Sequence, residues 1–489
     1  MMDFSIEEIA RAAGGQLFLR EGENGDRCVT SVILDSRKAE EGCVFLAVPG
    51  ERVDGHKFIP EVSAGGVALV VTQKTPEQVE AEHGYPAAAW GSYLLVEDTL
   101  TALKKIAESY RRKLPVKVVG ITGSVGKTST KEFIAGVLAE KYRVLKTEGN
   151  FNNEIGVPLT LLRIRPDTQV AVVEMGISDF GEMHRLSRMA RPDICVMTNI
   201  GQCHLENLKS REGILRAKSE IFDFMAEDGE VCLNGGDDML AGLSEVKGRK
   251  PHFFGLGENP MEEVSAGEIV SHGLWGSDAV LSWGGSVPGK VKVHIPLPGL
   301  HMVRNSAAAA CVGRLMGLTG EEIAAGISRL TPVSGRNHLI PLGQYTLIDD
   351  CYNANPGSMQ AALDLLSMAE GPKAAILGDM FELGENSGRL HAGIGEYAAR
   401  KGLQILLCTG RESRHMYEAA AREGKIGLLR YFETRQALLD YLEQNGEQIF
   451  PKQCAILVKA SHGMEFTGVL ECLERCLGQP EQGSQDTPL

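Results

Sequence analysis

Residues Gly120–Thr128 read Gly-Ile-Thr-Gly-Ser-Val-Gly-Lys-Thr, and this stretch decides the fold of the middle of the chain. The apolar run Val116–Val119 precedes it, and a helical pattern, Ser129–Tyr142, follows it. A strand, a glycine-rich turn and a helix in that order leave free backbone N–H groups that converge on one point and attract an anion. The sequence therefore predicts a loop that binds a nucleotide phosphate.

Each side chain of this loop suits phosphate chemistry. Gly123 and Gly126 let the backbone curl close to the phosphates around Ser124, Lys127 brings a positive charge to the β/γ oxygens, and the Thr128 hydroxyl suits Mg²⁺. The strict motif fails by one position, because its first glycine stands one residue early. The alternative is a glycine-rich turn that only connects two elements, but the strand and the helix that the motif requires are both present.

Length and composition limit the classes of protein that this chain can belong to. A chain of 489 residues is too long for one core, and its length suggests about three domains. Hydrophobic residues make up 43%, as in ordinary globular proteins, and the net charge is 50 − 64 = −14. This acidic balance argues against a nucleic-acid partner.

The chain has no recognisable membrane or export signal. No apolar stretch approaches the roughly 20 residues that span a bilayer, and the N-terminus lacks the basic and apolar regions of a signal peptide. The eleven cysteines are scattered without a Cys-x-x-Cys motif, so we interpret them as reduced thiols rather than zinc ligands or disulfides. We expect a cytoplasmic protein without stable membrane insertion.

Residues 1–97 are predicted to form a small α/β unit. The polar cluster Asp35-Ser36-Arg37 lies between predicted elements, and by itself it indicates an ordinary turn. The apolar patterns predict a helix around Ile6–Ala10 and strands at Val29–Leu34 and Val44–Val48, and the segment Gly65–Val71 ends in the buried-strand run Val67–Val71.

Residues 98–331 are predicted to form a second α/β unit around the phosphate loop. The strand Val170–Gly176 contains Glu174 near its carboxyl end, where parallel sheets collect ligands and where Mg²⁺ would need an acidic ligand. His204 follows the strand Asp193–Thr198, although a lone histidine is more often structural than a ligand.

Four further segments of this unit have clear patterns. Lys218 lies on the amphipathic helix Ile214–Met225, where a lysine is normally a solvated charge. The other predicted elements are the helix Leu100–Tyr110, a β-ribbon over 265–296 and the small-residue helix Asn305–Met316, which suggests close packing on a sheet.

Residues 332–478 alternate strands and helices, which predicts a doubly wound α/β domain. Its strands end in polar segments that should face a cleft, namely Asp349–Pro356, Gly378–Met380 and Lys459–Gly463. Residues 479–489 are rich in Pro, Gln, Gly and Ser, and we expect them to be disordered. The predicted strands are Thr346–Ile348, Ala374–Leu377, Ile405–Thr409 and Ala455–Val458, and the helices are Ser358–Met368, Leu390–Lys401, Ser413–Arg422 and Thr434–Glu443.

These motifs together resemble the Mur ligases from end to end. The phosphate loop of that family has the form Gly-x-Thr-Gly-x-x-Gly-Lys-Thr, so the early glycine is a family feature. Long motifs in three separate units carry the resemblance, namely Asp35–Arg37, Gly120–Thr128, Asn150–Pro158, Asp350–Ser358 and Leu377–Gly384. The resemblance implies an N-terminal domain for a uridine-diphosphate substrate, a central ATP-binding domain and a C-terminal Rossmann-like domain.

Within the family, the Asp350–Ser358 and Leu377–Gly384 motifs resemble the ligases that add D-alanyl-D-alanine to UDP-N-acetylmuramoyl-tripeptide in peptidoglycan synthesis. The resemblance implies a monomer that uses ATP and Mg²⁺ through an acyl-phosphate intermediate. The alternatives are a ligase of the MurE type, a folylpolyglutamate synthetase, or an ATP-driven switch that does not ligate. The third residue of the tripeptide, diaminopimelate or lysine, stays open.

The resemblance also implies roles for individual residues. Thr128 and Glu174 would hold one Mg²⁺, His204 would help to hold a second, and Lys218 would react with CO₂ to form a carbamate. A carbamate turns a cation into an oxygen ligand for a hard metal, which an ammonium cannot be. The implied nucleotide-binding residues are Asn305, Arg336, Asp350, Tyr352, Asn353 and Asn355, and the implied substrate-binding residues are Asp35, Ser36, Arg37, Asn150, Asn152 and Asn153.

Two positions depart from the family pattern. Met302 stands where the family commonly has an asparagine before the small-residue helix, which puts one polar contact to the nucleotide in question. His462 stands where a Lys-x-Ser-Arg motif has its arginine, and a histidine cannot supply the bidentate fork of a guanidinium.

Overall fold

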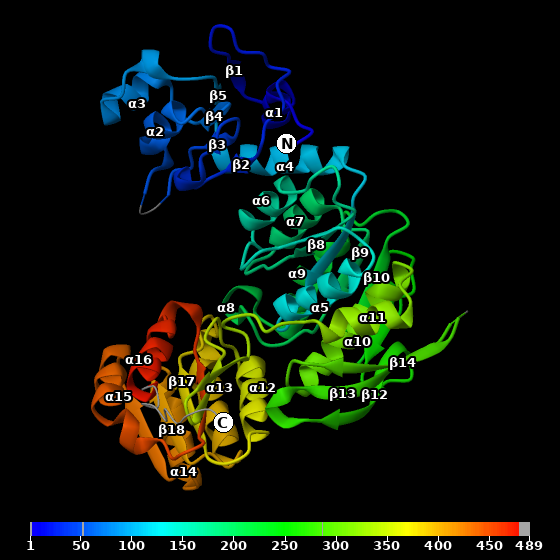
Figure 1. Cartoon of the computed structure of the whole chain (residues 1–489), viewed down its shortest axis with the longest axis vertical. Helices are drawn as coiled ribbons and strands as arrows, with labels where there is room; N and C mark the ends of the chain where they lie inside the picture. Colours follow the sequence, from blue (N-terminus) through cyan, green and yellow to red (C-terminus); the bar gives the residue numbers. More distant parts are fainter. Residues whose placement is uncertain (1, 51–52, 286, 479–489) are drawn as a thin grey trace, which may run out of the picture.

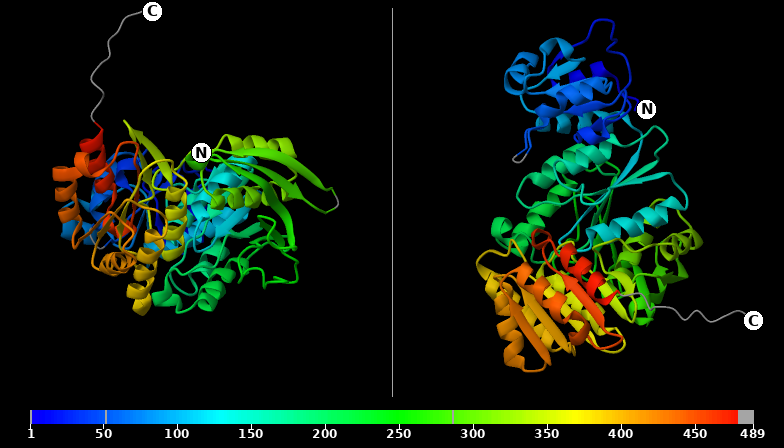
Figure 2. Two further views of the ribbon diagram at one scale, coloured as in Figure 1. Left: turned by 90° about the horizontal axis from the view of Figure 1, so that it is seen from below. Right: turned by 60° about the vertical axis from the view of Figure 1, so that its left-hand side comes forward.

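The computed structural model describes residues 2–50, 53–285 and 287–478, and the predicted disordered tail 479–489 lies outside the described residues. Three sheets form three successive units (Figure 1). The N-terminal unit lies at one end of the long axis of the molecule, and the C-terminal unit lies beside the far end of the central unit (Figures 1 and 2). No helix among the described residues combines the length and the apolar character that crossing a bilayer requires.

The N-terminal unit contains a five-stranded sheet in the order β1-β5-β4-β3-β2, with β1 antiparallel to β5. The predicted strand Val29–Leu34 is shorter than expected, because Val29 exchanges backbone hydrogen bonds with Met2 and Phe4 instead of joining the sheet. The elements are α1 (Ile6–Ala13), β1 (Gln16–Phe18), β2 (Val32–Ile33), β3 (Val44–Leu46), α2 (Ile59–Ala64), β4 (Leu69–Thr72), α3 (Pro76–His83) and β5 (Tyr93–Leu95).

Helix α4 (Thr99–Lys113) connects the first two units. The Asp98 side chain caps it by accepting from the backbone N–H of Thr101, and its basic last turn suits the negative end of the helix dipole. Its apolar face packs on α1 of the N-terminal unit and on two helices of the central unit. The buried Tyr110 hydroxyl donates to the Ile164 carbonyl at 2.7 Å, which ties α4 to the central unit.

The central sheet has nine strands in the order β14-β13-β12-β11-β10-β9-β6-β8-β7. The strands from β7 to β12 are parallel, and β12, β13 and β14 form the predicted antiparallel ribbon. The elements are β6 (Lys117–Thr122), α5 (Lys127–Ala139), β7 (Val144–Lys146), α6 (Gly156–Leu162), β8 (Val170–Glu174), α7 (Glu182–Ala190), β9 (Ile194–Met197), α8 (Leu205–Leu208), α9 (Arg211–Ser219), β10 (Glu230–Asn234), β11 (His252–Gly255), β12 (Glu262–Ser271), β13 (Ser277–Trp283), β14 (Gly289–Ile295), α10 (Leu300–Leu315) and α11 (Gly320–Ser328).

Alternate residues of the central strands bury into two separate cores. One core lies under α5, α10 and α11, and the other lies under α6, α7 and α9 and continues through α4 into the N-terminal unit. Two helices differ from the prediction. Helix α10 begins at Leu300, five residues early. Helix α9 covers Arg211–Ser219 and continues as a 3₁₀ turn, Glu220–Phe222, instead of reaching Met225, and the Glu220 carboxylate accepts from the backbone N–H groups of Gly181 and His184.

The C-terminal unit has a six-stranded sheet in the order β15-β16-β20-β17-β18-β19, parallel except for the edge strand β15. Helices on both faces give the predicted doubly wound arrangement, so the α/β fold class of three sheet-containing regions is confirmed. The elements are β15 (His338–Leu342), β16 (Tyr345–Asp349), α12 (Pro356–Ser367), β17 (Lys373–Gly378), α13 (Ser387–Ala399), β18 (Ile405–Thr409), α14 (Ser413–Glu423), β19 (Leu428–Phe432), α15 (Arg435–Ile449), β20 (Ala455–Lys459) and α16 (Thr467–Leu477).

Candidate functional site

The phosphate loop connects β6 to α5, and β6 is an interior strand of the central sheet, with β8 on one side and β9 on the other. Gly123 has φ 148°, and a Cβ atom there would lie 2.0 Å from Thr198 Oγ1. Gly126 has φ 83° and directly precedes α5. Only glycine fits both positions without strain, so these two glycines are required for this loop conformation.

Asn199, the second residue after β9, braces the loop from the side. Its carbonyl accepts from the Ser124 N–H at 3.0 Å, and its side chain makes two bonds of 2.9 Å with the backbone of Val125. The Lys127 ammonium donates to the Gly123 carbonyl at 2.8 Å, so it lies across the mouth of the loop. This geometry preorganises the loop around its lysine.

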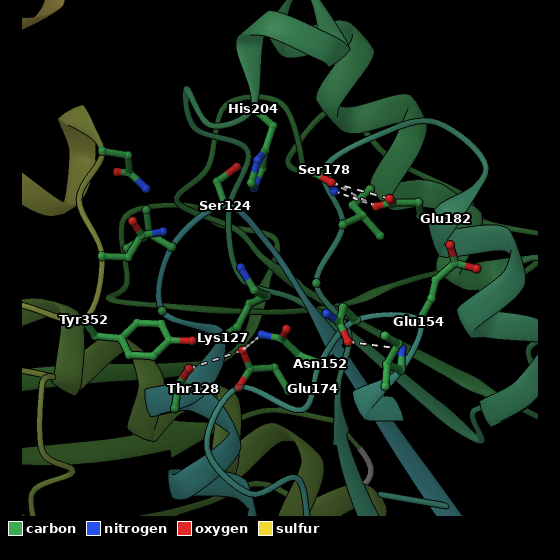
Figure 3. A pocket seen from close by; sticks show the side chains of 18 of the residues that line it. Ser124, Lys127, Thr128, Asn152, Glu154, Glu174, Ser178, Glu182, His204 and Tyr352 are labelled. Carbon is green, nitrogen blue, oxygen red and sulfur yellow. Dashed lines mark hydrogen bonds between the residues drawn. The ribbon is translucent and has the colours of Figure 1, made fainter. Parts of the chain in front are cut away.

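A cavity of about 510 Å³ opens above the loop, between the central and C-terminal units (Figure 3). Figure 3 shows Lys127, Thr128, Glu174, His204 and Tyr352 directed toward it. The predicted site residues that line it are Ser124, Gly126, Lys127, Thr128, Asn152, Asn153, Glu174, His204, Arg336, Tyr352, Asn353 and Asn355.

A second cavity of about 230 Å³ adjoins the first, since Gly126, Thr128 and Arg336 line both. The predicted residues Asn305 and Asp350 line this second cavity but not the first. Lys459, from a segment predicted to face a cleft, also lines it, as do four side chains for which the sequence predicted no role, namely His301, Arg304, Asn234 and Asn337.

Glu174 is buried at the end of β8 and has unused acceptor capacity. One carboxylate oxygen lies 3.2 Å from the Thr128 hydroxyl and 2.8 Å from the Asn152 amide nitrogen. The other oxygen is buried and has no hydrogen-bond partner among the described residues. A buried carboxylate oxygen without a donor, beside a threonine hydroxyl, fits the oxygen ligand set of Mg²⁺.

Lys218 is fully buried, which excludes the solvated helix charge that its position on an amphipathic helix suggested. Its Nζ atom has no hydrogen-bond partner among the described residues. Burial lowers the pKa of Lys218 to about 8, and the nearby Lys127 cation contributes in the same direction. A buried ammonium without a partner and near a second cation is costly, so this environment favours the neutral form of the amine.

His204 lies at the boundary between the central and C-terminal units. Its backbone is left-handed, with φ 51°, and it precedes α8. Its Nδ1 atom lies 2.5 Å from Glu382 Oε2, although the ring is not aligned for a regular hydrogen bond. This contact lowers the pKa of the Glu382 carboxyl. A histidine and a carboxylate from two units therefore meet at one edge of the larger cavity.

Asp350 and Lys459 form a buried ion pair across the ends of β16 and β20. The Lys459 ammonium lies 2.6 Å from Asp350 Oδ2 and also donates to the Asn353 carbonyl at 2.9 Å. Burial raises the pKa of Asp350, and the Lys459 cation opposes that shift. The pair fixes the segment that follows β16.

Arg336 stacks on Tyr352, with its guanidinium carbon 4.0 Å from the ring centroid. The ring of His462 lies 5.6 Å from the same tyrosine ring. Burial raises the pKa of Tyr352, and Asn150 is not among the described residues that line the larger cavity. Arg336 of the C-terminal unit lines both cavities together with Gly126 and Thr128 of the phosphate loop.

Some predicted site residues are already committed to local structure. The Asn355 side chain caps α12 by accepting from the Ser358 N–H at 2.9 Å, and Asn153 accepts from the N–H groups of Ile155 and Gly156 at the start of α6. Both still line the larger cavity. Their side-chain oxygens serve the fold, which leaves their amide nitrogens for a ligand.

The predicted substrate cluster Asp35, Ser36 and Arg37 lies in the N-terminal unit and, among the described residues, lines neither cavity. Ser36 begins a 3₁₀ turn that the Asp35 side chain caps. The Arg37 guanidinium forms two hydrogen bonds of 2.8 and 2.7 Å to Asp35, which lower the pKa of that carboxyl to about 2. The structure does not bring this cluster to the phosphate loop.

The two departures from the family pattern have different surroundings. Met302 is buried in the first turn of α10, and its sulfur lies 3.7 Å from the Asn305 amide nitrogen while Asn305 Oδ1 accepts from Thr130. His462 and Lys127 both line a neighbouring cavity of about 240 Å³. Met302 thus contacts the Asn305 amide, and His462 offers a hydrogen-bond donor on a side chain shorter than the arginine of the family pattern.

The sequence prediction missed Lys131, a buried lysine one turn after Lys127 on α5. Its ammonium donates to the Thr147 carbonyl at 2.8 Å and lies 3.9 Å from Glu174 Oε2. Its spacing of four residues from Lys127 places both on one side of the helix, and that signal could have identified it. Asn199 was also missed, although it follows a predicted strand end.

Comparison with known proteins gives consistent matches along the whole chain. Family models match residues 29–111 ("Mur ligase family, catalytic domain"), 121–313 ("Mur ligase middle domain") and 335–462 ("Mur ligase, glutamate ligase domain"). The UDP-N-acetylmuramoyl-tripeptide–D-alanyl-D-alanine ligase of Bacillus subtilis is 35% identical over 97% of this chain and 99% of its own length.

Solved structures agree with these matches. MurF from Acinetobacter baumannii superposes with a TM-score of 0.84 and 31% identity, over 96% of this chain and 99% of that one. MurF from Thermotoga maritima, in complex with ADP, has a TM-score of 0.77 and 28% identity, over 92% and 98% of the two chains. With a relative above 30% identity along nearly its full length, and with all three sheets superposed, this chain belongs to the Mur ligase family and is most similar there to the MurF ligases.

Proposed function

We propose that this chain is the ATP-dependent ligase that adds D-alanyl-D-alanine to UDP-N-acetylmuramoyl-tripeptide, giving the pentapeptide, ADP and phosphate in peptidoglycan synthesis. One observation carries the proposal: Lys127, the incompletely bonded Glu174 and Arg336 of the C-terminal unit all line one cavity. A cation, a metal-binding carboxylate and a second cation are what transfer of a γ-phosphate requires. The names of relatives that match along almost the full length support the choice of substrates.

ATP fits the two adjoining cavities. The smaller one, which contains Asn305 and Asp350, would take the nucleoside, and the larger one would take the phosphates and the acceptor carboxylate. The loop N–H groups and Lys127 would hold the β- and γ-phosphates, while Arg336 would reach them from the C-terminal unit.

Thr128 and Glu174 would hold Mg²⁺ with the phosphates, and His204 would help to hold a second ion. Bound Mg²⁺ supplies positive charge that neutralises the phosphate oxygens and the charge that accumulates during transfer. The unpartnered Glu174 oxygen is the feature of this chain that supports the first site.

We further propose that Lys218 is carbamylated. A carbamate would convert the buried, unpartnered amine into an anion beside Lys127, which removes the repulsion between the two cations. It would also supply the anionic oxygen that a second hard metal ion prefers.

The residues then act on the substrate in two steps. Lys127 and Arg336 stabilise the γ-phosphate as it moves to the terminal carboxylate of the tripeptide, giving an acyl phosphate with a good leaving group. The amine of D-alanyl-D-alanine attacks the acyl carbon and phosphate leaves. Because the cavity lies between two units, their closure would keep water from the acyl phosphate until the dipeptide arrives.

The proposed ligase function extends to the remaining residues and to the domain boundaries. Asp35, Ser36 and Arg37 would hold the uridine-diphosphate end of the substrate in the N-terminal unit, and Asn150, Asn152 and Asn153 would contact it nearer the loop. The domain boundaries are proposed at 97/98 and 331/332. We also propose that the protein is a monomer. A cytoplasmic location fits an enzyme that uses ATP and a nucleotide-linked substrate.

A blocked substrate tests this function. With the terminal carboxyl of the tripeptide converted to an amide, the carboxylate that would accept the phosphate is lost, so neither ADP nor pentapeptide should form above background when dipeptide is present. The free acid should give both, measured by mass spectrometry. Equal ADP formation from the free acid and the amide would reject the ligase and favour an ATPase.

Replacement of the proposed metal ligands should change the magnesium requirement. We expect Glu174→Gln and His204→Ala to shift the Mg²⁺ titration of ligase activity to at least about tenfold higher concentration, because each removes one ligand. His184→Ala is a matched control, since His184 also pairs with a carboxylate, Asp223, away from the cavity. If the Mg²⁺ titration is unchanged in both variants, Glu174 and His204 are structural residues and not metal ligands.

A further inference from the structure

We propose that His272, Asp278 and His294 form a Zn²⁺ site on the antiparallel ribbon of the central unit, in addition to the proposed Mg²⁺ sites. The site is separate from the phosphate loop and its Mg²⁺ ligands, because it lies on β12–β14 at the far edge of the nine-stranded sheet (Figure 1). It consists of two imidazoles and one carboxylate whose candidate ligand atoms all lie within 4.8 Å of one another.

The carboxylate already lies between the two imidazoles. His272 Nε2 is 2.9 Å from Asp278 Oδ2, and His294 Nδ1 is 2.8 Å from Asp278 Oδ1. An aspartate carboxylate is charged at neutral pH, so Asp278 offers an anionic ligand between the two imidazoles. Zn²⁺ bonds of about 2.0–2.2 Å to N and O ligands would need only small rotations of these exposed side chains.

The backbone holds the three residues in register. Asp278 on β13 is the direct cross-strand partner of His294 on β14, so their side chains lie on the same face of the ribbon. His272 follows β12, where its N–H donates to the Gly276 carbonyl at 2.9 Å and closes the turn into β13. Because paired strands carry Asp278 and His294, and a closed turn next to them carries His272, little ordering is needed on binding.

The ligand types select the metal. Imidazole nitrogens suit Zn²⁺ and other late transition ions, whereas Mg²⁺ prefers carboxylate, carbonyl and water oxygens. Three protein ligands on an exposed surface would leave a fourth position for water. The solvent-facing side chains, 42–53% exposed, give the ion direct access.

A metal there would brace the contact between two units. The turn from β12 to β13 carries Leu274, which is buried in the core of the C-terminal unit that includes α12 residues. His272 and Asp278 flank that turn, so an ion that joins them would limit its movement. Zn²⁺ should therefore stabilise the arrangement of the ribbon on α12.

Zinc titration of the full chain tests the site. The protein is stripped with a chelator and titrated with Zn²⁺ against a chromophoric chelator, with excess Mg²⁺ present to occupy oxygen sites. We expect Asp278→Asn and His294→Ala to bind one Zn²⁺ fewer, or to bind it at least about tenfold more weakly, than the wild type. The melting temperature should rise with Zn²⁺ in the wild type and rise less in the variants.

His252→Ala is the matched control, since His252 also lies between two carboxylates, 2.7 Å from Glu263 and 3.1 Å from Glu230, without a second histidine. It should bind Zn²⁺ as the wild type does. All variants keep the eleven cysteines, so thiol binding cancels in the comparison. Equal Zn²⁺ stoichiometry and affinity in the wild type, Asp278→Asn and His294→Ala would overturn the proposal.

Discussion

Lys127→Ala should lower phosphate release by about 10³-fold while the fold stays intact, because removal of one group that stabilises transferred charge has effects of about that size. Lys127 lies at the mouth of the loop, and its hydrogen bond to the Gly123 carbonyl does not hold an apolar core together. The measurement is single-turnover phosphate release, with circular dichroism to check folding.

Lys141→Ala is the control for Lys127. Lys141 is exposed just after α5 and donates to the Gly317 carbonyl, so its loss removes a lysine near the same helix but far from the cavity. It should keep near wild-type activity. If Lys127→Ala retains activity within about tenfold of wild type, about 1.4 kcal/mol of barrier, the phosphate-loop assignment fails.

Lys218→Ala should lose about 10²–10³-fold in activity, and a short carboxylic acid should restore part of it. The acid can place an anionic oxygen where the carbamate would lie, in the space that the missing side chain leaves. Restoration by acetate also separates lost chemistry from lost folding, since an unfolded variant would not respond.

Lys218→Arg should stay inactive although it keeps the positive charge, because a guanidinium neither forms this carbamate nor ligates a cation. Arg216→Ala on the same helix is the control, since Arg216 is exposed and packs over Phe180. Full activity in Lys218→Arg would mean that only a cation is needed there, and the carbamate would have to be abandoned.

Features with a local signal could be predicted from the sequence. The loop Gly120–Thr128 determines its own strand and helix, and the run Val170–Glu174 places its carboxylate at a sheet edge because parallel strands end together. Helical spacing located α4 and α13 within a few residues. Short strands with weak patterns were missed, among them β1, β5 and the edge strand β19, because distant partners stabilise them rather than their own residues.

Features that depend on tertiary contacts could not be predicted. Helical periodicity suggested a solvated Lys218, but the fold buries it completely. The approach of Glu382 to His204 joins residues 178 positions apart, and no local pattern encodes that distance. Likewise, the sequence placed Asp350 and Lys459 in two polar segments that face a cleft but did not predict their ion pair, because only the order of strands β16 and β20 in the sheet makes them neighbours.

Phosphate release with ordered addition tests the central claim, that this chain is a ligase, most directly. The enzyme is mixed with ATP, Mg²⁺ and UDP-N-acetylmuramoyl-tripeptide, and D-alanyl-D-alanine is added last. The account predicts at most one equivalent of ADP and almost no free phosphate before that addition, then steady phosphate release matched by pentapeptide, because phosphate leaves only when the amine attacks. Steady phosphate release from ATP and Mg²⁺ alone, unchanged by either substrate, would contradict it.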